Sequence, residues 1–104
     1  FETWGEPKLV FVPDERDDDG SMARLNRVRP ILDMPTKAAM VRTEFYGIGG
    51  PYQAESCVIV FPWMITVNNK GRYGNQDGCG EVQLAVSRDL ERWDRPCRAP
   101  AIPL

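Results

Sequence analysis

The stretch LAVSRDLERWDRP, from Leu84 to Pro96, carries the strongest fold signal in the sequence. It opens as a strand in which polar and apolar residues alternate, breaks at Ser-Arg-Asp-Leu, and resumes at Trp93. Asp89 is placed to accept hydrogen bonds from backbone N–H groups two residues further on, which fixes a tight turn. We expect Leu90 and Trp93 to fold back onto the sheet, because a buried Trp removes on the order of 150–250 Å² from water.

A fainter copy of the same phrase opens the chain as FETWGEP. Trp4 corresponds to Trp93 and Pro7 to Pro96, at an offset of 89 positions. The segment KLVFVP that follows is β-branched and aromatic and ends in a proline, so a strand is expected there. Residues 1–13 are therefore interpreted as the last strand of a preceding structural unit.

Between these two phrases, most of the chain has the texture of strands joined by local turns. The expected strands are TEFYGIG (43–49), CVIVFPWMITVNN (57–69), EVQLAVS (81–87) and a fourth opened by RWDRP (92–96). Pro62 predicts a bulge or an edge position in the second strand. The glycine-rich KGRYGNQDGCG (70–80) is expected to be a hairpin loop. The sequence thus predicts an all-β fold with a four-stranded antiparallel meander, the unit of a propeller blade.

The segment between the first phrase and the meander is interpreted as an insertion. DERDDDGS, which starts at Asp14, is expected to be a solvated turn, because its acids before Gly20 lack the later Glu of a calcium loop. The following SMARLNRVRPILDMP has apolar residues at helical spacing, but its prolines limit any helix to about two turns. We expect residues 14–42 to form a loop with at most a short helix.

Composition excludes several classes of site and partner. The net charge is −2 without a basic stripe, so no nucleic-acid partner is expected. No apolar run approaches the ~20 residues that span a bilayer, so no membrane partner is expected. The chain shows no signal-peptide pattern, and its localisation stays open. The absence of His removes Ser-His-Asp and Cys-His machinery from this chain.

Three cysteines, Cys57, Cys79 and Cys97, show no CxxC spacing, so a metal site is not expected. Three unpaired thiols are favoured, and one disulfide with a free thiol remains an alternative.

The segment EVQLAVSRDLERWDRP, with APAIPL behind it, resembles the S-x-D-L-x-x-W turn of five-bladed β-propeller glycoside hydrolases of families 32 and 43 and their bacterial relatives. In those relatives a stretch like EFYG, YQAES and VFPW precedes the turn at a similar distance. The resemblance covers residues 43–104 well and residues 1–13 more loosely. It implies one propeller blade with its exit strand over residues 43–104, preceded by the end of another blade.

The resemblance also implies carboxylates near the central channel, where paired acids hydrolyse glycosidic bonds without a metal or an organic cofactor. Glu44 is the first candidate, because it opens the strand expected to line the channel beside aromatic residues that would raise its pKa. Glu55, in QAESC, is the second, since it resembles the Glu-Cys acid/base region of family 32. Asp89 resembles the catalytic Arg-Asp-Pro of that family, but the proline is missing and the structural turn accounts for it.

Aromatic and amide side chains near these acids are candidates for contact with a sugar. Tyr46 and Trp63 could stack on the C–H faces of sugar rings, although a core position is favoured for Trp63 because it lies inside an apolar strand run. Asn68 and Asn69 could donate hydrogen bonds to hydroxyl groups. The expected partners are a carbohydrate substrate and missing blades of a parent chain or other copies of this one.

The sequence therefore predicts part of a glycoside hydrolase-like propeller, whose catalytic set is completed by other blades. Two alternatives stay open: a non-catalytic carbohydrate-binding or interaction propeller, and a self-contained small β-domain. Fold alone does not separate them.

Overall fold

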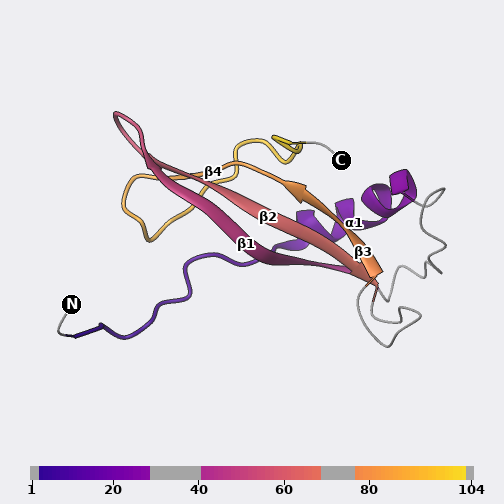
Figure 1. Ribbon diagram of the computed structural model, residues 1–104, viewed down its shortest axis with the longest axis horizontal. Coiled ribbons are helices and arrows are strands. Elements are labelled where there is room, and N and C mark those ends of the chain that lie inside the picture. Colours follow the sequence, from indigo (N-terminus) through magenta and orange to yellow (C-terminus); the bar gives the residue numbers. More distant parts are fainter. Residues whose placement is uncertain (1–2, 29–40, 69–76, 103–104) are drawn as a thin grey trace.

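The computed structural model describes residues 3–28, 41–68 and 77–102. These residues form a helix and four strands: α1 (Glu15–Val28), β1 (Val41–Gln53), β2 (Val58–Asn68), β3 (Asp77–Val82) and β4 (Ala85–Ser87). Figure 1 shows a long twisted sheet with α1 beside one end and the N-terminal segment running away from it. The sheet is antiparallel and has four strands, as predicted, but it is not the predicted four-stranded meander, because β4 pairs with β2 rather than with β3.

β2 is the central strand, since β1 pairs along one side of it and both β3 and β4 pair along the other. Pro62 lies where this second side is interrupted: the ladder with β3 ends at Trp63, and the ladder with β4 resumes at Val60. Proline has no N–H to donate, which fits this interruption. The predicted bulge is not found at Pro62, since Phe61, Pro62 and Trp63 pair with β1 without a register shift. The alternative edge position is wrong, because Pro62 lies opposite Ile48 in the centre of the sheet.

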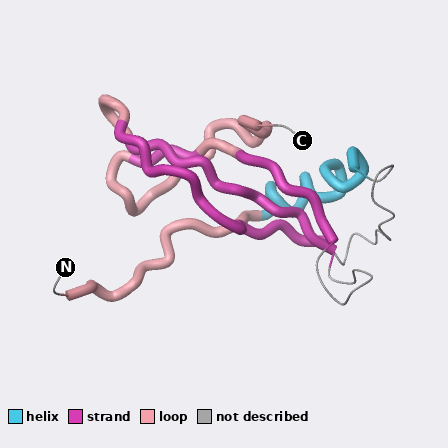
Figure 2. Tube along the Cα trace, viewed as in Figure 1, coloured by secondary structure: helices cyan, strands magenta, loops and turns pink. Residues whose placement is uncertain are grey.

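Two of the expected strands have different extents. β3 starts at Asp77, inside the segment expected to be a hairpin loop, and the expected strand 81–87 is divided into β3 and β4. The expected fourth strand, RWDRP, is reduced to a single bridge in which Asp94 and Val86 exchange two backbone hydrogen bonds of 2.8 and 2.9 Å. The tube in Figure 2 follows this C-terminal segment as loop beside β4.

The N-terminal segment is not a strand in the part of the chain that the structure describes, which corrects the prediction for KLVFVP. Its anchor is Phe11, whose ring stacks on Phe45 of β1 at 4.4 Å and lies 6.2 Å from Trp93. Leu9 is 86% exposed. The β-branched and aromatic residues of KLVFVP favour a strand locally, but a strand also needs a neighbouring strand that supplies its backbone hydrogen bonds.

The acidic run expected to be a turn is the start of α1, a helix of 14 residues. The backbone N–H of Asp14 donates to the Asp17 carboxylate at 2.9 Å, which is one half of a capping box, and the N–H of Asp17 donates to the Asp14 backbone carbonyl at 2.9 Å. The acids Glu15, Asp17 and Asp18 also favour the positive end of the helix dipole. The helix ends at Val28, two residues before a proline.

Polar side chains hold α1 against the sheet. The hydroxyls of Ser21 and Thr43 lie 2.7 Å apart, and Nε of Arg24 donates to Thr66 at 2.9 Å. Leu25 packs with Cys79 of β3 as the apolar part of this contact. The other buried polar side chains include Asp17, Glu81, Gln83, Ser87 and Arg95.

Arg95 joins the C-terminal segment to α1 through a buried ion pair. Its two terminal nitrogens donate to the two carboxylate oxygens of Asp17 at 2.7 and 2.6 Å. Arg98 adds bonds of 2.9 and 2.6 Å to Asp14, and it lies 3.0 Å from Asp17. Hydrogen bonding to Arg98 lowers the pKa of Asp14 from 3.8 to about 2, and the bond to Asp14 raises the pKa of Arg98. Helix and C-terminal segment are thus connected by charge rather than by an apolar core.

Within the described residues, α1 is neither long nor apolar enough to cross a membrane. Cys57, Cys79 and Cys97 are all free thiols, which agrees with the favoured prediction. Burial raises the pKa of Cys79.

Candidate functional site

The two faces of the sheet have different environments. Thr66, an even-numbered residue of β2, contacts α1 through Arg24, and side chains alternate between faces along a strand. The odd-numbered residues Phe61 and Trp63 therefore lie on the face turned away from α1. We call this the open face, since its aromatic side chains are partly exposed.

Tyr46 and Trp63, both predicted to contact a sugar, come together on the open face. Their rings meet edge to face, with centroids 5.0 Å apart and planes at 78°. Tyr46 falls in a register shift of β1, since Phe45 pairs with Met64 and Gly47 with Trp63. Such a bulge redirects the side chain of the extra residue.

Trp63 is supported by a glycine on the neighbouring strand. A Cβ added to Gly80 of β3 would collide with the indole nitrogen, so the ring lies directly over the backbone there. Trp63 is 45% exposed and Tyr46 is 66% exposed, which leaves aromatic surface open to solvent. The alternative prediction of a core position for Trp63 is wrong within the described chain.

A second aromatic pair on the same face was missed by sequence reasoning. Tyr52 of β1 and Phe61 of β2 meet edge to face, with centroids 5.9 Å apart. Tyr52 closes the second register shift of β1, between Gly49 and Tyr52, and is 59% exposed. The available signal was the alternation of Phe61 and Trp63, but pairing each with its tyrosine requires the strand register.

Glu44 lies on β1 opposite Ile65, with 40% of its side chain exposed, and forms an ion pair with Nε of Arg42. Glu55 is exposed in the turn after β1. Glu44 pairs with Ile65 of β2, and Gln53, which precedes Glu55 at the end of β1, pairs with Val58. These two partners are seven positions apart on β2, so Glu44 and Glu55 lie about 20 Å or more apart. Paired carboxylates act within about 5–9.5 Å of one another, so these two do not form such a pair.

The amide candidates give less information. Asn68 is the last residue of β2, paired with Val41 and Asp77. Asn69 lies outside the described residues.

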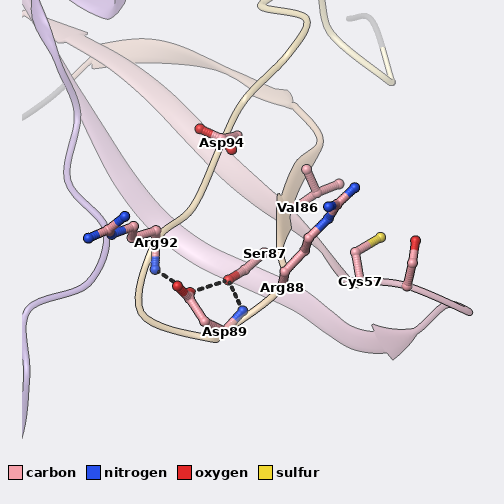
Figure 3. A pocket seen from close by; sticks show the side chains of 8 residues that line it. Cys57, Val86, Ser87, Arg88, Asp89, Arg92 and Asp94 are labelled. Atoms are coloured by element: carbon pink, nitrogen blue, oxygen red, sulfur yellow. Dashed lines mark hydrogen bonds between the residues drawn. The ribbon is translucent and has the colours of Figure 1, made fainter.

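A hollow near the opposite end of the sheet contains the turn from which the sequence analysis started (Figure 3). It is lined by Ser56, Cys57, Val86, Ser87, Arg88, Asp89, Arg92 and Asp94. Asp89 accepts hydrogen bonds from the backbone N–H groups of Glu91 and Arg92 at 2.9 and 2.8 Å. The predicted turn role of Asp89 is confirmed, and these bonds lower its pKa.

The packing predicted for the two apolar residues of the turn is only partly correct. Leu90 is 56% exposed and has a φ of 65°, so it does not fold onto the sheet. Trp93 is half-buried, and its indole N–H donates to the Leu90 carbonyl at 3.2 Å. The hollow is therefore shaped by a self-contained turn whose carboxylate is already engaged.

Among the described residues, no group of acidic, His or Cys side chains is arranged to hold a metal ion. The aromatic pairs on β1 and β2 form a surface with exposed rings, and Glu44 lies nearby on β1. No protein-family model, curated protein or solved structure matches this chain.

Proposed function

We propose that this chain is a blade of a β-propeller related to glycoside hydrolases, and that β1 contributes a carbohydrate-contact site to it. The observation that carries the proposal is the Tyr46–Trp63 pair: an exposed tyrosine turned out by a bulge and held in place by an indole. Pyranose rings present C–H groups on their faces, and such faces pack on aromatic rings. The antiparallel order of β1, β2 and β3, each beside the next, supports the blade assignment.

In this proposal β1 lines the central channel, so Tyr46 provides the platform and Trp63 supports it. Glu44, two residues earlier on β1, accepts hydrogen bonds from sugar hydroxyls. Neighbouring blades or other copies pack elsewhere, on the N-terminal segment, where Trp4 and Leu9 are 87% and 86% exposed.

The experiment is a titration of the protein with a panel of neutral glycans, followed by calorimetry or by tryptophan fluorescence. Tyr46→Ala should weaken binding about 5-fold, the loss of about 1 kcal/mol of aromatic packing. Trp4→Ala is the matched control, because it removes an exposed aromatic ring outside the sheet. Equal affinities of wild type and Tyr46→Ala would contradict the proposed site.

Hydrolysis by the parent protein is the catalytic form of this proposal, and it requires a second carboxylate from another blade. Glu44→Gln in that protein should lower turnover by orders of magnitude if Glu44 is catalytic, because the amide cannot transfer a proton or act as a nucleophile. Glu55→Gln serves as the comparison. Unchanged turnover in both variants would remove them from the catalytic set, whereas sugar binding without turnover would favour the non-catalytic alternative.

A further inference from the structure

Among the described residues, the open face carries two aromatic pairs, Tyr46–Trp63 and Tyr52–Phe61, and the distance between them limits which ligands can contact both. Gly47, the residue after Tyr46, pairs with Trp63 of β2, and Tyr52 pairs with Ile59. Trp63 and Ile59 are four residues apart on β2, so the two tyrosines lie about 13 Å apart along the sheet. This distance is longer than one pyranose ring. A single sugar unit that stacks on Tyr46 therefore cannot reach Tyr52.

Tyr46 and Tyr52 have the same kind of surroundings. Each is at a register shift of β1, each is more than half exposed, and each is held edge to face by an aromatic residue of β2. Trp63 and Phe61, the two supporting residues, are two positions apart on one strand and so point to the same face. The two rings thus form one strip along β1.

The strip carries no charge of its own. No charged residue occurs from Phe45 to Ala54, and the nearest charges at one end, Arg42 and Glu44, neutralise each other as an ion pair. The segment between the tyrosines contains three glycines, Gly47, Gly49 and Gly50, and Gly49 pairs opposite Phe61. An extended, uncharged ligand with several flat apolar faces fits these features.

We propose that the strip binds a linear neutral oligosaccharide that runs along β1, with one unit stacked on Tyr46 and a later unit stacked on Tyr52. This inference rests on the proposed carbohydrate site and extends it from one sugar unit to a chain. The second contact is intramolecular once the first has formed, so affinity increases with chain length until both tyrosines are reached and then levels off.

The test is a titration with cello-, xylo- and malto-oligosaccharides of increasing length, from the monosaccharide to the hexasaccharide. For the series that binds, affinity should rise with length by at least roughly 5-fold and then level off. Tyr52→Ala should remove this rise, so that its affinity no longer depends on chain length. Tyr52→Phe, which keeps the ring, should behave as wild type. Tyr52→Leu removes the ring but keeps an apolar contact with Phe61. It should also lose the rise, and it replaces Tyr52→Ala as the test if the alanine variant does not fold.

The outcomes separate the two proposals. Binding that depends on Tyr46 but shows no length dependence would overturn the strip and keep the single-sugar site. Absence of binding in every series would overturn both. Self-association that is lost in Tyr52→Leu but not in Trp4→Ala would show that the strip is an interface between copies, which also contradicts the proposal.

Discussion

Asp17 shows how far a residue's surroundings can depart from its sequence context. It sits in a run of acids that suggests a solvated surface, yet it is 1% exposed and bound by Arg95, 78 positions later. Taking two charges out of water is costly, and their mutual hydrogen bonds offset that cost. Removing the charge of Asp17 leaves the buried Arg95 with longer contacts to Gln83 and Asp14, both at 3.3 Å.

We expect Asp17→Asn to lower the free energy of unfolding by about 3–5 kcal/mol, as measured by urea denaturation. Glu91→Gln is the control, since it breaks an ion pair with Lys8 in which both side chains are largely exposed. That change should cost less than about 1 kcal/mol. Equal effects of the two substitutions would mean that Asp17 is not buried in an ion pair.

Asp14 gives the protein a defined acid dependence. Its pKa in the folded protein is about 2, below the ordinary value of 3.8, because Arg98 binds the carboxylate. The stabilisation is therefore complete above about pH 4 and is lost as the pH falls towards 2. Since 45% of the side chain is exposed, solvent screening limits it to about 1 kcal/mol or less.

Urea unfolding of wild type and Asp14→Asn between pH 5 and 2 measures this contribution. The stability difference between the two proteins should shrink as the pH falls, because only the wild type loses the interaction. A difference that stays constant would show that the Arg98 contact does not depend on the charge of Asp14.

At the level of elements, the sequence predicted what is local and missed what is long-range. The alternation in the strands and the hydrogen bonds of Asp89 were found, because neighbouring residues determine them. α1 was missed because its stability depends on contacts with Thr43, Thr66 and Arg95. The sheet partner of each aromatic residue was equally hidden, since it depends on register and on two irregularities of β1.

Gly20 tests how tightly α1 is fitted to the sheet. Alanine usually stabilises a helix interior by about 1 kcal/mol relative to glycine. Here a Cβ would lie 2.7 Å from a terminal nitrogen of Arg24, a side chain already bound to Thr43 and Thr66. We expect Gly20→Ala to destabilise the protein in thermal melts, and stabilisation would show that Arg24 is free to move.

The turn after β4 contains a residue, Leu90, with a strained backbone conformation. Leu90 has a φ of 65°, a conformation that costs a residue with a Cβ roughly 1 kcal/mol, and its side chain is 56% exposed. Leu90→Gly should therefore raise the free energy of unfolding by about 0.5–1 kcal/mol. Leu90→Ala, which keeps the Cβ, should give no such gain, and a similar gain from both would attribute the effect to the lost side chain instead.

At the scale of the whole molecule, the two faces of the sheet have different surroundings. One face is joined to α1 and the C-terminal segment by charges and hydroxyls, and the other presents aromatic residues. The antiparallel sheet could be predicted from the sequence, and so could Tyr46 and Trp63 as candidates. The large distance between Glu44 and Glu55 could not be predicted from the sequence alone, because it depends on the length of β1.

The most direct test of the central claim is to map amide and indole N–H chemical shifts by nuclear magnetic resonance during a titration with a neutral oligosaccharide. The account predicts that the shifts change along β1 from Tyr46 to Tyr52 and at the Trp63 indole, with little change in α1. Changes confined to the hollow around Asp89, or absent from the open face, would contradict it.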